Sequence, residues 1–357
     1  MKIAQVAPLM ESVPPLTYGG TERVVSYLTE ALIDLGHDVT LFASGDSSTR
    51  ARLVPVVARS LRRQPNPPDW LMWHTVMLDQ VFARASDFDV IHFHVDFLHY
   101  PLVRHCPTPC LTTLHGRLDL PDLLPLHRHF REQPLVSISQ GQRKPLADCR
   151  WVATVPHGLP DNLYHLHEKP SDYFAFVGRI APEKRLDRAI EIAIATGTRL
   201  RIAAKVDRVD AAYFDSRIRP LLNHPLIEHI GEIDQVAKDD FIGQARALLF
   251  PIDWPEPFGL VLIEAMACGT PVVAYRCGAV PEIVRDGVTG YIVDDQQQAI
   301  AAARRIDRID RRACRRAFEA RFTASRMAQR YVAVYDALSA AMPPHVAHEQ
   351  VVAKAPI

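Results

Sequence analysis

The amino-acid sequence predicts an α/β fold built from two domains, each with a parallel sheet. A strand, an amphipathic helix and a second strand follow one another between Ile3 and Ala43, which is the order of a βαβ unit. A second series of strands and helices begins at Tyr173. The length of 357 residues suits two such domains better than one.

The first half of the chain is expected to form one sheet. A loop rich in Pro and Gly follows the first strand, and a helix then begins at Thr21 and ends at Gly36, a residue suited to a helix C-cap. The expected strands are the apolar segments Ile3–Ala7, Val39–Ala43, Asp89–His94, Cys110–Leu114, Leu135–Ile138 and Trp151–Val155.

The second half is expected to form another sheet, after a polar stretch without periodicity over residues 160–172. Its expected strands are Tyr173–Val177, Leu200–Ala204, Ile227–Ile230, Ala247–Phe250 and Pro271–Tyr275, and its expected helices are Leu186–Thr196, Lys238–Ala245 and Gly259–Ala267. We therefore predict an N-terminal domain over 1–165, a second domain over 166–325, a separate helix over 326–341 and a disordered tail over 342–357.

The composition excludes some classes of partner. Lys plus Arg and Asp plus Glu both number 41, so no overall field attracts nucleic acid or an anionic membrane. No stretch approaches the roughly 20 apolar residues that span a bilayer, and the N-terminus does not resemble a secretory signal. The six cysteines form no CxxC pair, which favours reduced thiols and a cytoplasmic location.

A pair of glutamates is the strongest local signal. Glu256 precedes the expected helix and Glu264 lies two turns inside it, so both carboxylates can border one cleft and accept hydrogen bonds from paired hydroxyls. A solvated surface role suits Glu264 poorly, because it lies in an apolar run. With Pro257 just ahead of the helix, we expect a phosphate at the free amides of Phe258, Gly259 and Leu260.

Two cations follow the strand that begins at Tyr173. Gly178 allows close backbone approach, Arg179 comes directly after it, and Lys184 follows five residues later. An Arg fork and a Lys point charge can hold phosphate oxygens and stabilise a departing diphosphate. Ordinary surface charges on a turn are the alternative.

The expected first domain offers two weaker signals. The pair Gly19-Gly20, between Tyr18 and Thr21, would let backbone amides approach a ligand, although an ordinary loop fits equally well. His115 follows an apolar strand, where its imidazole would face the cleft and contact a sugar hydroxyl. A histidine satisfied by backbone groups is the alternative.

Other patterns favour no site. His92 and His94 share a strand face but are more typical of a buried strand than of a zinc site, and Asp87-Phe88-Asp89 is more typical of surface than of a metal-binding motif. We therefore predict no metal ligands. The dinucleotide fingerprint GxGxxG is missing, which disfavours a nicotinamide oxidoreductase.

Together these motifs resemble the family 4 retaining glycosyltransferases of the GT-B fold, over about residues 1–340. The resemblance rests on the E-x7-E element from Glu256 to Glu264, on Gly178-Arg179 with Lys184, on Gly19-Gly20, and on the segments Gly269–Ala274 and Gly287–Tyr291. It implies two Rossmann-like domains whose parallel sheets face a central cleft, with the C-terminal helix crossing back to the first domain.

The resemblance also implies roles. Arg179 and Lys184 would hold the donor diphosphate, Glu264 the ribose hydroxyls, and Glu256 the donor sugar, with Gly20 near the phosphates and His115 at the reaction centre. His157-Gly158 replaces an Asn-Gly pair of many relatives, and residues 203–207 replace a Gly-rich turn near the nucleotide base, so the base stays open between UDP and GDP.

The expected reaction is front-face transfer of a hexose with retention, without a metal or other required cofactor. A nucleotide-sugar epimerase or phosphorylase on a similar scaffold is the alternative, and a sugar-binding protein without catalysis is a second one. The partners are a nucleotide sugar and an unidentified acceptor, contacted by the loops at residues 55–69 and 116–133, and no nucleic acid. Peripheral contact with the inner membrane face, the oligomeric state and the acceptor stay open.

Overall fold

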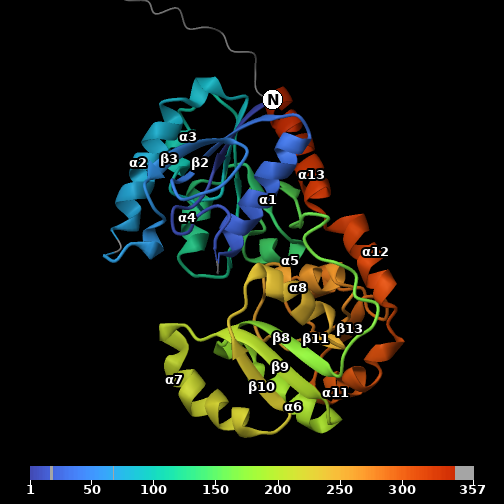
Figure 1. Ribbon diagram of the computed structural model, residues 1–357. Helices are drawn as coiled ribbons and strands as arrows, with labels where there is room; N and C mark the ends of the chain where they lie inside the picture. The colour runs from blue at the N-terminus through green and yellow to red at the C-terminus, as the bar shows by residue number, and fades with distance from the viewer. Residues whose placement is uncertain (17–18, 67, 342–357) are drawn as a thin grey trace, which may run out of the picture.

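The computed structural model describes residues 1–16, 19–66 and 68–341, which form two parallel sheets (Figure 1). Within these residues the first sheet has seven strands in the order β3-β2-β1-β4-β5-β6-β7, and the second has six in the order β10-β9-β8-β11-β12-β13. Each order reverses beside the first strand of its sheet, as in doubly wound folds. The predicted tail over 342–357, and Tyr18 beside the glycine pair, lie outside the described residues.

The first sheet belongs to the upper part of Figure 1. Its strands are β1 (Lys2–Val6), β2 (Asp38–Ser44), β3 (Arg52–Val57), β4 (Val90–Phe93), β5 (Cys110–Thr113), β6 (Leu135–Ser137) and β7 (Trp151–Thr154). Its helices are α1 (Gly20–Asp34), α2 (Trp70–Phe82), α3 (Tyr100–Val103), α4 (Leu123–His129) and α5 (Gln140–Arg143), with short turns η1 (Leu61–Arg63), η2 (Ala85–Asp87) and η3 (Lys144–Leu146).

The second sheet occupies the lower part. Its strands are β8 (Tyr173–Arg179), β9 (Arg199–Lys205), β10 (Ile227–Gly231), β11 (Ala247–Phe250), β12 (Val272–Tyr275) and β13 (Gly290–Val293). Its helices are α6 (Leu186–Thr196), α7 (Ala211–Tyr213), α8 (Gln235–Gly243), α9 (Leu260–Ala267), α10 (Val280–Ile283), α11 (Gln296–Arg304) and α12 (Arg311–Arg321), with η4 (Pro182–Lys184), η5 (Arg208–Asp210), η6 (Phe214–Ile218), η7 (Arg219–Asn223) and η8 (Ile306–Arg308).

The apolar runs become strands because both faces of each sheet are covered. Ile3 of β1, for example, pairs in parallel register with Val39 of β2 and Val90 of β4, and all three side chains are buried. The prediction of two parallel-sheet domains is therefore confirmed.

The sequence prediction missed several elements, of which three bear on the expected loops and helices of the first domain. β3 occupies the start of the segment expected to be an acceptor loop at 55–69, and it tolerates Pro55 because it lies at the edge of its sheet. Helix α4 likewise interrupts the loop expected at 116–133. In α2 apolar residues lie on several faces, since Trp70 and Met72 are exposed while Met77 is buried, so no helical periodicity was visible.

The C-terminal helix α13 (Ala324–Ala341) crosses back to the first domain and runs beside α1 (Figure 1). Its Tyr331 and Tyr335 are buried there. The chain passes between the two domains twice, near residue 159 and near residue 322. These two segments are hydrogen-bonded to each other, since the Leu159 amide donates to the Phe322 carbonyl at 2.9 Å. Within the described residues, no helix is both long and apolar enough to cross a bilayer.

Candidate functional site

The loops that carry the candidate residues leave the carboxyl ends of parallel strands, where ligands of such sheets bind. In the second domain, Lys184 follows β8 and Glu256 follows β11. In the first domain, His115 follows β5. The two sets of loops meet around residues 254–260, as the contacts below show.

Glu256 and Lys184 are brought together, 72 residues apart in the chain. The Lys184 ammonium forms a close ion pair with Oε2 of Glu256, and the same oxygen accepts a hydrogen bond of 3.0 Å from Trp254 Nε1. The ammonium also lies 4.8 Å from the centre of the Trp254 ring, within the range of a cation–π contact. A cation, a carboxylate and an aromatic face therefore share one small region.

The helix after this loop begins later than the sequence predicted. Gly259 is the N-cap residue with φ of 90°, a left-handed conformation that a helix excludes, so α9 begins at Leu260. Phe258 and Gly259 thus precede the helix instead of opening it, and Pro257 is not at its first position. The carbonyl of Pro257 instead accepts a hydrogen bond of 2.6 Å from Ser139 of the first domain.

Glu264 is buried on α9, and its partner was not predicted. Lys238 of α8 donates to its two carboxylate oxygens at 3.0 and 3.2 Å. One turn before Lys238, the side chain of Gln235 accepts a hydrogen bond of 3.2 Å from Arg23 of α1, which belongs to the first domain. No sequence signal singled out Lys238, because it lay in an ordinary surface-helix pattern.

Arg179 lies among acidic side chains rather than beside Glu256. Its guanidinium pairs with Glu183 at 2.5 Å, with Asp210 at 3.3 Å and with Asp207 at 3.6 Å. The turn that holds it is tied to the Glu256 loop, since the Asp253 amide donates to the Glu183 carbonyl at 2.9 Å. The turn that carries Arg179 is therefore joined by a backbone hydrogen bond to the loop that carries Glu256, although the Arg179 side chain pairs with other residues.

The glycine pair of the first domain approaches the start of α9. Gly19 is the N-cap of α1 with φ of 154°, and a Cβ there would come within 2.8 Å of Pro15. A Cβ on Gly20 would lie 3.9 Å from the Leu260 side chain of the second domain. The loop before α1 therefore lies beside the start of α9, and a side chain at Gly19 would collide with Pro15 of the same loop.

His115 also faces this region. Its ring stacks on His157 at 5.3 Å between ring centres, and His157 meets the edge of Phe258 at 4.8 Å. Two residues on, the Arg117 guanidinium lies 5.8 Å from the Trp254 ring centre. Burial lowers the pKa of His115 to about 3, so the imidazole is neutral at pH 7.

The structure accounts for the other histidines differently. His92 bonds to Tyr335 and Thr113, and His94 bonds to Gln5 and His115. Among the described residues, no three His, Cys, Asp or Glu side chains gather as metal ligands would.

Comparison with known proteins assigns this arrangement to a family. Residues 18–177 match the model described as Glycosyltransferase Family 4, and residues 164–317 match Glycosyl transferases group 1. A relative from Mycolicibacterium smegmatis named D-inositol 3-phosphate glycosyltransferase is 34% identical over 360 residues, covering 81% of this chain and 80% of its own. The chain belongs to the family 4 glycosyltransferases.

Solved structures share the fold of this glycosyltransferase. A glycosyltransferase of avilamycin A biosynthesis is 26% identical, with a TM-score of 0.75 over 96% of this chain and 98% of that one. A sucrose-phosphate synthase from Thermosynechococcus elongatus is 20% identical, with a TM-score of 0.77 over 96% and 100%. The Anabaena protein HepE in complex with UDP-glucose is 17% identical, with a TM-score of 0.71 over 95% and 100%. The fold is GT-B.

In this glycosyltransferase one further residue joins the two domains at the site. Both carboxylate oxygens of Glu282 on α10 accept backbone hydrogen bonds from the first domain, at 2.7 Å from Gln140 and 2.6 Å from Gly141. A Cβ on Gly141 would lie 3.0 Å from the Gly278 carbonyl, so the two loops are in contact. No sequence pattern singles out Glu282.

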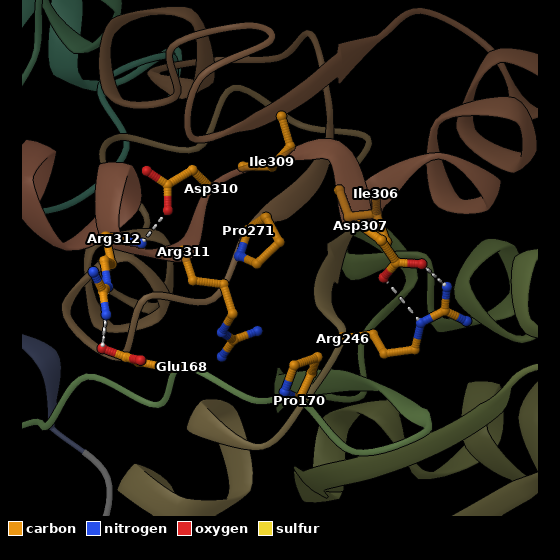
Figure 2. Close-up of a pocket in the computed structure, with 10 residues that line it drawn as sticks. All are labelled: Glu168, Pro170, Arg246, Pro271, Ile306, Asp307, Ile309, Asp310, Arg311 and Arg312. Carbon is orange, nitrogen blue, oxygen red and sulfur yellow. Dashed lines mark hydrogen bonds and ion pairs between the residues drawn. The ribbon is translucent and has the colours of Figure 1, made fainter.

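A separate cavity of about 510 Å³ lies elsewhere in the second domain (Figure 2). Pro170, Arg246 and Pro271 line it, and these residues precede β8, β11 and β12, so it lies at the amino ends of the strands. Figure 2 shows Arg246 paired with Asp307, and the guanidinium of Arg311 donates to the carbonyls of Gly243, Ala245 and His167. Its arginines are thus engaged by the protein, at the end of the sheet opposite to the candidate site.

Proposed function

We propose that this glycosyltransferase transfers a hexose from a UDP- or GDP-sugar to an acceptor hydroxyl, with retention and without a metal ion. The observation that carries the proposal is the group of Lys184, Trp254 and Glu256 at the start of α9, with His115 and His157 reaching it from the first domain. The complex of the Anabaena neighbour with UDP-glucose supports a nucleotide-sugar donor.

The donor would lie along the carboxyl ends of β8 and β11. Lys184 and Arg179 would hold the diphosphate, with the N-terminal amides of α9 beside it. Both cations are paired with carboxylates in the structure, so a bound diphosphate would exchange one anionic partner for another. Glu256, released from Lys184, would then accept hydrogen bonds from hydroxyls of the sugar.

Glu264 would hold the ribose. Its side chain is only 4% exposed and is held in place by Lys238, which leaves a fixed acceptor for a pair of hydroxyls. Gly20 would let the loop before α1 pass close to the phosphates, opposite Leu260.

The reaction would proceed on one face of the sugar. The bond between the anomeric carbon and the diphosphate oxygen breaks while the acceptor oxygen forms its bond from the same side. The acceptor proton passes to the departing diphosphate oxygen. The protein would contribute position and fixed positive charge, and neutral His115 would line the reaction centre.

Two fixed cations and a helix end can neutralise the leaving group, which is the basis for expecting metal independence. The rate should be unchanged by a chelator. A rate abolished by the chelator and restored by manganese would refute this part of the proposal.

A thermal-shift screen of UDP-, GDP-, ADP- and TDP-sugars tests the donor, because a bound donor raises the melting temperature by mass action. The stabilising donor is then incubated with an acceptor panel that includes inositol phosphates, and the anomeric configuration of the product is read by NMR. Retention is expected. An inverted product, or conversion of the donor to an epimer without acceptor, would overturn the proposal.

The location is part of the proposal. The six cysteines are free thiols, and the balanced charge offers no overall attraction to anionic lipid, which supports a cytoplasmic enzyme.

A further inference from the structure

The side chain of Gln5, buried on β1, lies between two chains of hydrogen bonds. Its Nε2 donates to the hydroxyl of Tyr335 on α13 at 3.2 Å. Its Oε1 is 2.8 Å from Nε2 of His94. An amide has a donor end and an acceptor end, so its orientation dictates the direction of both chains.

The first chain leads toward the candidate site. Oε1 of Gln5 is an acceptor, so Nε2 of His94 must carry the proton. Burial lowers the pKa of His94 well below its usual value, so this imidazole is neutral and its Nδ1 is an acceptor. Nδ1 of His94 is 2.8 Å from Nε2 of His115, which must therefore donate.

His115 then has one possible form. With Nε2 protonated and the ring neutral, Nδ1 carries only a lone pair. That Nδ1 is buried and has no hydrogen-bond partner among the described residues. An unsatisfied buried acceptor is uncommon in proteins, and a substrate hydroxyl would satisfy it.

The second chain of hydrogen bonds leads from Gln5 to α13, and the donor end of the amide determines its direction. Tyr335, which accepts from Gln5, donates to Nδ1 of His92 at 2.8 Å. Nε2 of His92 donates to Thr113 Oγ1 at 2.7 Å, and that oxygen is 2.9 Å from the Tyr331 hydroxyl. Turning the Gln5 amide over would reverse the bonds of His94, His115, Tyr335 and His92, so the orientation of this one side chain links α13 to His115.

We propose that Gln5 and His94 are positioning residues that hold His115 as its Nε2–H tautomer, with Nδ1 kept as an acceptor for a substrate hydroxyl. The catalytic consequence rests on the proposed function, in which His115 lines the reaction centre. The tautomer itself does not depend on that function. The helix that returns from the second domain thereby takes part in fixing a group at the site.

The tautomer is measured on the full chain labelled with ¹⁵N-histidine, by long-range ¹H–¹⁵N correlation without any ligand. The His115 signals are assigned by their loss in His115→Asn. The expected pattern has a protonated Nε2 and an unprotonated Nδ1 that stay unchanged between about pH 6 and pH 8. A protonated Nδ1, or an averaged signal in the wild-type protein, would overturn the proposal.

Two substitutions of His94 test the mechanism. His94→Leu removes the acceptor and should give an averaged His115 signal, whereas His94→Asn offers Oδ1 in place of Nδ1 and should restore the wild-type pattern. The matched control is His99→Leu, which removes a buried histidine bonded to Thr112 outside the two chains. It should leave the His115 signals unchanged.

Kinetics with the donor found in the thermal-shift screen give the second readout. In His94→Leu, kcat should fall at least about tenfold while KM for the donor stays within about twofold, and His94→Asn should recover most of the loss. An unchanged kcat in His94→Leu would overturn the positioning role. If neither nucleotide sugars nor UDP bind the wild type, the proposed function fails. The spectra still decide which nitrogen of His115 carries the proton. Should His94→Leu not fold, the spectra of the wild type and of Gln5→Leu decide which nitrogen of His115 carries the proton.

Discussion

Glu264 and Lys238 form an ion pair at 3.0 Å in which the carboxylate is almost completely buried. The two residues lie on neighbouring helices, α9 and α8, and the lysine reaches both oxygens of the glutamate. A buried charge is costly unless a partner compensates the loss of water. Lys238 is the partner that compensates the carboxylate of Glu264 and holds it in place.

Removing this lysine should destabilise the protein. Lys238→Met leaves the charge of Glu264 uncompensated, and we expect a loss of about 3–5 kcal/mol in the free energy of unfolding, measured by urea denaturation. Adding Glu264→Gln should recover part of that loss, because the amide carries no charge. Arg316→Met, which breaks an exposed pair with Asp310, is the control and should cost less than about 1 kcal/mol. A double variant less stable than Lys238→Met would contradict this account.

Lys184 should be required for turnover of the donor. We expect Lys184→Ala to lower kcat/KM about 100-fold or more, because the proposed function assigns this cation to the leaving diphosphate. Lys184→Arg should lose less, since the charge stays near Trp254. The control is Lys169→Ala, an exposed lysine that forms no ion pair with any of the residues that the structure describes. A near-native rate in Lys184→Ala would show that the diphosphate lies elsewhere.

Glu282 should help to keep the two domains together. In Glu282→Gln one of the two oxygens that accept from Gln140 and Gly141 becomes an NH₂ donor, and a charge-assisted bond is lost. We expect the radius of gyration of the free protein in X-ray scattering to increase, and KM for the donor to rise several-fold with kcat nearly unchanged. Glu228→Gln, on the surface of the second sheet, should leave both values as they are. An unaltered radius and KM would show that other contacts hold the domains.

Buried histidines should make the protein sensitive to acid. Burial lowers the pKa of His99 and of His115 to about 3, below the unfolded value of about 6.5. The unfolded state thus binds more protons below pH 6.5. The stabilisation is complete above that pH and is lost as the pH falls toward 3, by about 1.4 kcal/mol per pH unit for each histidine.

The measurement is the free energy of unfolding between pH 6.5 and pH 5. The slope of this free energy against pH should be smaller in His99→Leu, by the amount that corresponds to about one proton taken up on unfolding, because one titrating group is gone. The exposed His105→Leu is the control for the substitution itself. A slope in His99→Leu equal to that of the wild type would mean that His99 is protonated to the same extent in both states.

The fold could be predicted because its information is local. Continuous apolar runs such as Leu248–Phe250 become strands that are covered on both faces, and the alternation of strands and helices specifies a parallel sheet. Prediction was weakest where the local pattern was mixed. β3 contains Pro55, and α2 exposes Trp70 while it buries Met77, so neither element had a clear periodicity.

Some residues of the candidate site could also be predicted from local sequence, and others could not. The sequence singled out Glu256, Lys184 and His115 because each follows a strand and bears a group suited to sugars or phosphates, and the structure gathers them around the start of α9. Their roles stay predictions. Lys238, Trp254 and Glu282 were not singled out, because each has an ordinary local context. The partners of Lys238 and Glu282 are also distant in the chain.

The sequence by itself determined two parallel α/β domains, the membership of a glycosyltransferase family and a short set of residues fit for a nucleotide sugar. Only the tertiary structure decided which charges face each other and which way the hydrogen bonds of Gln5 and His94 run. The physical reason is distance: hydrophobic periodicity acts over a few residues and is visible in the sequence. Ion pairs and hydrogen-bond directions depend on ångström-scale contacts between segments that lie far apart in the chain, such as β1 and α13.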